Sequence, residues 1–412
     1  MERVVVTGLG VVSNIGTDVP AFWDGLVSGR SGIDRIQSFD ASGLSTHIAG
    51  EVRNFSFDMK LGKRMDRFAQ FAFSAAQQAL AQAGLMPEDG GAAHVDPDRI
   101  GVCIGTGIGG EPFLEAQHTK FLEKGPGRFH PLTVPIIIAN MASANVAIHH
   151  KLHGPNLCVS TACATGNHSI GMALDIIRAG RADAMLAGGT EAVITAFGID
   201  GYSQLRALST RNEDPKGASR PFSKGRDGFV LAEGAGVLML ESLSHARKRG
   251  AEILAEVAGF GMTSDGYHLT APHPEGLGAV RAIQLAIRDA GLNPEDVDYI
   301  NAHGTSTDLN DTLETRAIKT VFGDHARKLA VSSIKSMVGH SLGGSAGIEA
   351  VASVLTVKHG VLPPTINLTE PDPELDLDYV PLQARQQPVN AILSNSFAFG
   401  GHNAVVAFKR FA

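Results

Sequence analysis

The residue best suited to nucleophilic chemistry is Cys163, in the run STACATG at residues 160–166. This run follows a short apolar segment and precedes a helix-compatible stretch that ends near Gly180. A sharp turn from a strand into a helix exposes a nucleophile, and the free N–H groups at the helix start favour a thiolate. We therefore predict that Cys163 is a nucleophile with a lowered pKa. The common alternative, a small buried core cysteine, is expected for Cys103 and Cys158, which lie in predicted strands.

Two histidines lie in polar, glycine-bearing loops that suit a partner for this cysteine. His303 belongs to NAHGTST at residues 301–307, directly after a predicted strand, and His340 belongs to KSMVGHSLGG at residues 335–344. Among sixteen histidines, a single one is best explained as a structural residue. Two histidines in polar loops that occupy similar positions in the sequence pattern favour a shared catalytic role.

Composition limits the class of protein that carries these residues. The 412 residues hold 43% hydrophobic and 19% charged side chains, which excludes a disordered chain or a coiled coil. The net charge of −7 with no long basic run argues against nucleic acid or an anionic membrane as a partner. Three cysteines form neither a disulfide framework nor a zinc pattern, and no signal peptide or membrane span is found. We predict a cytoplasmic enzyme without a metal.

Short β-branched runs alternate with segments of helical periodicity, as in α/β proteins whose strands are buried on both faces. Helices are predicted over residues 67–82, 279–290 and 345–359, which close at Gly84, Gly291 and Gly360. The expected strands lie at 4–6, 100–104, 183–186, 237–240, 299–300 and 329–331.

Four segments recur in the same order, which indicates an internal duplication. The pairs are residues 4–10 with 256–261, 100–110 with 297–307, 157–166 with 329–347, and 182–192 with 390–401. We predict two halves, 1–250 and 251–412. The first half is longer, and insertions at 20–95 and 110–150 are expected to supply dimer contacts and a substrate pocket. Duplication places the carboxyl ends of strands from both halves around one site.

These motifs, together with NSFAFGGHN at residues 395–403, resemble the thiolase-fold condensing enzymes along essentially the whole chain, and among them the β-ketoacyl-acyl-carrier-protein synthase II family. The resemblance implies two βαβαβαββ halves in a layered α-β-α-β-α sandwich. It also implies a homodimeric acyltransferase that elongates acyl chains on acyl carrier protein by decarboxylative condensation with a malonyl group, in type II fatty-acid synthesis. No cofactor is implied.

The resemblance also assigns roles near the nucleophile. Cys163 accepts the acyl group, and its backbone N–H forms an oxyanion hole with that of Phe399. His303 and His340, neutral with Nε2–H directed at a thioester oxygen, stabilise the enolate. Lys335 supports the site through a carboxylate, for which Glu314 is the expected partner.

Further residues are assigned to substrate and carrier binding. Thr305 and Thr307 match pantetheine-binding threonines, and Ile108 matches an acyl-pocket gate. Glu111 and Thr133 are polar where the family usually has apolar residues, and we expect Glu111 to point to solvent or to a partner chain because Pro112 follows it. A basic patch for the acidic carrier is predicted from four residues: Lys63, Arg64, Arg67 and Arg206.

Other readings share parts of this pattern. By family pattern, a degradative thiolase has a second cysteine and a chain-initiating synthase has an asparagine in place of His340. A non-catalytic chain-length partner of a polyketide synthase lacks the cysteine. A ketosynthase of a specialised fatty-acid or polyketide pathway remains an alternative, because its motifs are nearly identical.

Overall fold

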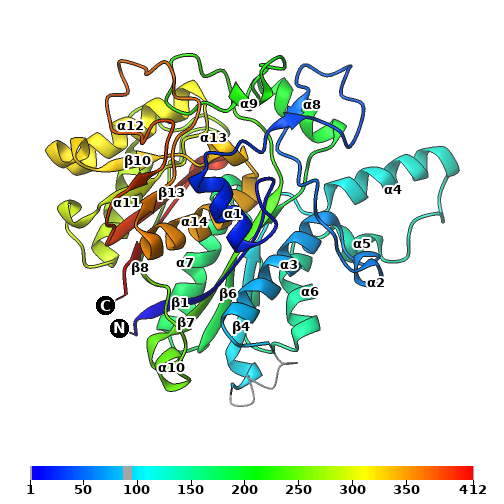
Figure 1. The fold of residues 1–412 in the computed structure, drawn as a ribbon. Helices are drawn as coiled ribbons and strands as arrows, with labels where there is room; N and C mark the ends of the chain where they lie inside the picture. The colour runs from blue at the N-terminus through cyan, green and yellow to red at the C-terminus, as the bar shows by residue number, and fades with distance from the viewer. Residues whose placement is uncertain (1, 87–94, 412) are drawn as a thin grey trace.

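The computed structural model describes residues 2–86 and 95–411, and its main feature is a large mixed β-sheet (Figure 1). The strand order is β10-β9-β13-β14-β8-β1-β7-β6-β4-β5. The five strands from the first half of the chain lie on one side of the β1–β8 junction and the five from the second half lie on the other. Their positions correspond in pairs, so the four recurring segments are equivalent in space.

The strands of this sheet are β1 (Val4–Val12), β4 (Ile100–Gly105), β5 (Asn156–Leu157), β6 (Ala184–Glu191), β7 (Gly234–Ser242), β8 (Ala255–Ser264), β9 (Tyr299–Asn301), β10 (Ala330–Ser332), β13 (Ala391–Ala398) and β14 (His402–Lys409). Two small two-stranded sheets pair β2 (Asp34–Arg35) with β3 (Ile48–Ala49), and β11 (Val361–Leu362) with β12 (Arg385–Gln386).

The two halves of the sheet, on either side of the β1–β8 junction, form two β-layers, and the helices between and outside them bring the number of layers to five. They are α1 (Val19–Val27), α2 (Met59–Gly62), α3 (Arg67–Gln82), α4 (Glu111–Lys124), α5 (Thr133–Ile137), α6 (Met141–His150), α7 (Thr165–Arg178), α8 (Ala196–Gln204), α9 (Pro215–Ala218), α10 (Leu243–Lys248), α11 (Leu277–Asp289), α12 (Asp308–Phe322), α13 (Lys335–Val338) and α14 (Ser345–His359). Helices α7 and α14 pack on strands of both halves, while α3 with α6 and α11 with α12 cover the outer faces (Figure 1). The predicted α-β-α-β-α sandwich is confirmed.

The predicted strands are present, and two helices match their predicted bounds. Helix α3 begins after Asp66, whose carboxylate accepts the Phe68 N–H, and α14 ends at Gly360, which has a φ of +64°. Strand β1 continues beyond the predicted run through Gly8 and Gly10. A Cβ at either glycine would lie within 2.0 Å of a carbonyl oxygen of α3, so these glycines let the helix pack closely on the strand.

The predicted insertions are partly wrong. Helix α3 packs on β1 and β7 as α11 packs on β8 and β14, so α3 belongs to the repeated unit. Helix α6 likewise lies between β4 and β5 in the chain, as α12 lies between β9 and β10. Of the predicted ranges, residues 20–66 and the segment with α4 and α5 are additional to the repeat, and residues 87–94 lie outside the described part. Among the described residues, no helix combines the length and apolar character needed to cross a membrane.

Candidate active site

Cys163 lies in a short 3₁₀ turn, Ala162–Ala164, that leads directly into α7. Ala162 has a φ of +49°, a strained conformation that produces the sharp turn predicted from the sequence. The thiol is buried, with 7% of the residue exposed. Burial raises the pKa of Cys163 to about 12, against the opposing charge of Lys335. The prediction of a lowered pKa is therefore wrong for this state, because removal of water from the thiol outweighs the helix terminus.

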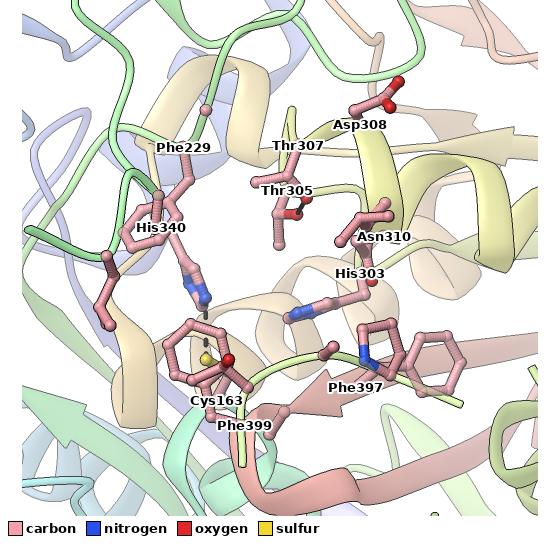
Figure 2. A pocket seen from close by; sticks show the side chains of 18 of the residues that line it. Cys163, Phe229, His303, Thr305, Thr307, Asp308, Asn310, His340, Phe397 and Phe399 are labelled. Carbon is pink, nitrogen blue, oxygen red and sulfur yellow. Dashed lines mark hydrogen bonds between the residues drawn. The ribbon is translucent and has the colours of Figure 1, made fainter. Parts of the chain in front are cut away.

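His340 is the ring closest to the thiol. Its Nε2 lies 3.1 Å from the Cys163 Sγ (Figure 2). Its Nδ1 lies 2.8 Å from the Ser345 Oγ. The preceding Gly339 has a φ of +74°, and the His340 N–H donates to the Val230 carbonyl at 2.8 Å. Burial and Lys335 hold the pKa of His340 well below its usual range, so the ring is neutral near pH 7.

His303 is held by a buried lysine. The Lys335 Nζ lies 3.4 Å from the His303 Nδ1 and forms an ion pair with Glu349. An ammonium group can only donate, so it requires an unprotonated Nδ1 and leaves the proton of a neutral ring on Nε2. Burial, Lys335 and His340 keep the pKa of His303 well below its usual range. The Cys163 sulfur and one nitrogen of each histidine lie within 4.8 Å of one another.

The predicted pairing of Lys335 with Glu314 is wrong. The Glu314 carboxylate accepts the backbone N–H groups of His303 at 2.9 Å and Gly304 at 2.8 Å, and the Asn395 side-chain amide at 3.0 Å. Its oxygens are thus occupied by the loop that carries His303. Glu314 positions the backbone of this loop, whereas Glu349 neutralises Lys335.

Cys163, His303 and His340 line a cavity of about 400 Å³. Thr305 and Thr307 line its wall, and their hydroxyl oxygens are 2.9 Å apart (Figure 2). Phe399 also lines the cavity and lies beside Cys163 in Figure 2. Its turn, Phe399–Gly401, packs against the Cys163 turn, and a φ of +79° at Gly400 reverses the chain there.

The residues assigned to the acyl pocket lie elsewhere. Ile108 does not line this cavity, and 43% of it is exposed. Glu111 begins α4 and is buried, with its carboxylate 3.1 Å from the Thr195 hydroxyl. The expectation that Glu111 faces solvent or a partner is wrong, because its side chain is buried beside Thr195, whose hydroxyl also lies 2.5 Å from the Glu115 carboxylate. Thr133 is half-buried and donates its hydroxyl proton to the His130 carbonyl at 2.6 Å.

The predicted basic patch is divided. Lys63 and Arg64 are exposed beside α2, and Arg206 is exposed at the rim of the cavity. Arg67 instead forms an ion pair with Glu233 at 2.7 Å and donates to the Val52 carbonyl. Its guanidinium is already bound within the chain, which makes it a poor docking residue.

Sequence reasoning missed Glu349 and Ser345. Both lie in α14, which is buried from Ser345 to Val357. A buried carboxylate requires a cationic or hydrogen-bonding partner, and Glu349 stands in a helix of otherwise small and apolar residues. Its sequence context could therefore have predicted a buried ion pair. Ser345 carried none, since its contact with His340 depends on how the turn at residues 341–344 folds.

Comparison with known proteins agrees with this architecture. Residues 1–246 match the β-ketoacyl synthase N-terminal domain and residues 254–369 match the C-terminal domain. The chain is 54% identical to 3-oxoacyl-[acyl-carrier-protein] synthase 2 of Synechocystis sp., over 100% of this chain and 98% of the relative. It is 50% identical to the protein of the same name from Coxiella burnetii, over 99% of each chain.

Solved structures share the fold along the full chain. A β-ketoacyl synthase from Burkholderia phymatum superposes with a TM-score of 0.91 at 35% identity, covering 100% of both chains. A type II polyketide ketosynthase, solved with its acyl-carrier protein and bound to the hexaketide, superposes with a TM-score of 0.89 at 37% identity and the same coverage. By sequence and by structure, this chain belongs to the β-ketoacyl synthase family, whose members are condensing acyltransferases.

Proposed function

We propose that the chain elongates acyl groups on acyl carrier protein by condensation with a malonyl group, in type II fatty-acid synthesis. The observation that carries the proposal is the placement of the Cys163 thiol 3.1 Å from the His340 ring, with His303 beside both. Identity supports this pathway over the polyketide alternative, since it reaches 54% with the synthase 2 relative against 37% with the polyketide ketosynthase.

In the first step, the Cys163 sulfur attacks the carbonyl carbon of the acyl thioester. The new C–S bond forms as the bond to the carrier thiol breaks, and the thiol proton passes to the departing sulfur. The exchange is nearly balanced, because one thioester replaces another. The backbone N–H groups of Cys163 and Phe399 are proposed to stabilise the oxyanion.

In the second step, the malonyl thioester loses CO₂ and leaves an enolate. His303 and His340 are proposed to donate Nε2–H to its oxygen, which a neutral His303 held by Lys335 can do without gaining a proton. The enolate carbon then attacks the acyl group on Cys163 and releases the thiolate, which takes up a proton from solvent to restore the thiol. Thr305 and Thr307 are proposed to hold the pantetheine amides from the cavity wall. Ile108 lies outside this cavity, but its loop contacts the segment before Cys163, where the Ser160 hydroxyl donates to the Gly107 carbonyl at 3.1 Å, and Ile108 is proposed to gate the acyl chain from that side.

A homodimer and an acidic carrier are proposed as partners. Helix α4 extends away from the body of the molecule (Figure 1). It and the following segment expose large apolar side chains: Leu114, Phe121, Leu122, Phe129, Leu132, Val134 and Ile138. An exposed apolar surface of this kind is typical of an interface, and a second copy of the chain is the proposed partner. Arg206, Lys63 and Arg64 are proposed to attract the carrier, and residues 1–250 and 251–412 to form the two halves of a cytoplasmic enzyme.

The test is intact-mass measurement after incubation with acyl carrier protein that bears a defined acyl group. We expect one acyl adduct on the wild type and on the matched control Cys158→Ser, and none on Cys163→Ser. Addition of malonyl carrier protein should discharge the adduct and release a 3-ketoacyl product. An adduct that persists in Cys163→Ser would overturn the proposal.

A further inference from the structure

Glu191 is a buried carboxylate that the proposed mechanism does not use. It is the last residue of β6, has no exposed surface, and pairs across the sheet with Gly234. Its Oε1 accepts the Thr106 hydroxyl at 2.6 Å and the Ile108 N–H at 3.2 Å. Its Oε2 accepts the N–H groups of Gly107 at 2.8 Å and Gly343 at 3.2 Å.

These contacts indicate the ionised form. Burial raises the pKa of Glu191 above its ordinary value, and the hydrogen bonds from Thr106, Gly107, Ile108 and Gly343 reduce that rise. Backbone N–H groups can only donate, so they stabilise the carboxylate more than the acid. Among residues 2–86 and 95–411, no lysine, arginine or histidine forms an ion pair with it. Glu191 is therefore a negative charge held by dipoles alone.

The backbone packs tightly around this carboxylate. A Cβ at Gly107 would lie 2.7 Å from the Glu191 Oε2. A Cβ at Gly343 would lie 2.5 Å from the Gly107 nitrogen and 2.9 Å from the same Oε2. The loop after β4 and the turn after His340 thus close onto one group, and only glycine fits at either contact.

We infer that Glu191 is a positioning residue that ties the loop of Ile108 to the turn behind His340 and keeps a negative charge near Cys163. Movement of Ile108 to admit an acyl chain would pull on the carboxylate that also holds Gly343, three residues after His340. The acyl gate and the condensation donor are coupled in this way. The coupling between Ile108 and His340 rests on the proposed function, whereas the effect of the Glu191 charge on the Cys163 thiol does not.

The effect of Glu191 on the pKa of the Cys163 thiol can be separated from the effects of the other charged groups. A Cβ at Gly107 would lie 2.7 Å from the Glu191 Oε2 and 3.8 Å from the Cα of Ala162, the residue before Cys163, so the carboxylate lies beside the Cys163 turn. The titratable or charged groups around the thiol are the following: His340, His303, Lys335, Glu349, Tyr202 and Glu191. Lys335 lowers the pKa of the thiol, whereas Glu191 and Glu349 raise it. Removal of the Glu191 charge alone should therefore make the thiolate form at lower pH.

The first test follows alkylation of Cys163 by iodoacetamide against pH in the full-length protein, with the modified peptide identified by mass. Glu191→Gln removes the charge and keeps the length, while Glu191→Asp keeps the charge and shortens the reach. We expect Glu191→Gln to move the profile to lower pH by about one unit, or about tenfold in rate at fixed pH. Glu191→Asp should stay close to the wild type. Equal shifts in both variants would show that looser packing of the loops, and not the charge, acts on the thiol, and would overturn this assignment. The absence of a shift in both variants would overturn it as well.

Glu241→Gln is the matched control. Glu241 is also fully buried and lies at the other end of the same strand pair, opposite Ala184, about 23 Å along the strand at ~3.3 Å per residue. Its profile should equal that of the wild type. A shift there would show that the measurement reports general destabilisation.

The second test separates acylation from condensation with donors of increasing acyl length. Both Glu191 variants should lose condensation kcat by about tenfold or more, since both break the link to Gly343, while acylation by long donors is retained. An equal loss in acylation and condensation at every length would overturn the coupling. If the wild type forms no malonyl-dependent product, the proposed function fails, and the alkylation profiles still decide the role of the charge.

Discussion

Replacement of Lys335 by methionine tests how the structure sets the tautomer of His303. The ammonium group contacts the His303 Nδ1 at 3.4 Å and is 1% exposed, so methionine fills a similar space without a donor. In Lys335→Met the neutral ring is free to carry its proton on Nδ1. That tautomer has no Nε2–H for the enolate oxygen, so decarboxylation should slow while acylation of Cys163 persists.

The magnitude follows from the contact that is lost. A hydrogen bond to a charged group contributes ~1.5–3 kcal/mol, and a separation of 3.4 Å favours the lower half of this range. This corresponds to a loss of about 10- to 40-fold in rate. Removal of one partner from a buried ion pair also costs about 3–5 kcal/mol of stability, because Glu349 is left without Lys335. The double variant Lys335→Met/Glu349→Gln removes this unpaired acid and should show the same kinetic loss at a higher Tm.

The assay measures CO₂ release from malonyl carrier protein, and acylation by intact mass, between pH 5.5 and 8.5. Loss of the Lys335 cation raises the pKa of His303, and a protonated ring carries hydrogen on both nitrogens. Burial and His340 still lower that pKa, so the deficit of Lys335→Met should shrink progressively toward the acidic end of this range. The control Lys358→Met breaks an exposed ion pair with Glu252 and should stay within twofold. A decarboxylation rate within twofold of the wild type in Lys335→Met, or a deficit that grows at low pH, would refute the tautomer argument.

Three other predictions test separate parts of the molecule. His340→Ala should retain measurable acylation and lose condensation by about 10²–10³, the usual size for one oxyanion donor; intact mass and product formation distinguish this from a general loss. Burial raises the pKa of Glu111 from 4.5 to about 7, so the wild type should lose stability relative to Glu111→Gln as pH rises through that window. The free energy of unfolding in urea should be ~1–2 kcal/mol higher for Glu111→Gln than for the wild type at pH 8, after allowance for partial exposure. An equal difference at pH 4 would contradict this. Arg206→Glu should raise the carrier KM by about two- to fivefold at low salt without changing kcat, and an unchanged KM would remove Arg206 from the docking surface.

Local patterns were enough to predict much of the fold and the candidate site. The bounds of α3 and α14 follow from apolar periodicity and from the cap at Asp66 and the glycine at 360, which act within one turn of the helix. The duplication placed Cys163 and His340 in equivalent loops, and equivalent loops of a duplicated sheet meet at one place. The bend at Cys163 and the meeting of these side chains were therefore encoded in order and spacing.

Other features depended on which surfaces pack together. Glu314 and Glu349 are both acids near Lys335, and the loop of His303 takes the first and leaves the second for the lysine. The thiol of Cys163 is at a helix start, yet its pKa is raised because residues from both halves of the chain exclude water from it. Glu111 turns toward Thr195, which is distant in sequence. Sequence spacing fixes what lies within a few residues, whereas burial and the pairing of charges are set by segments that only the tertiary structure brings into contact.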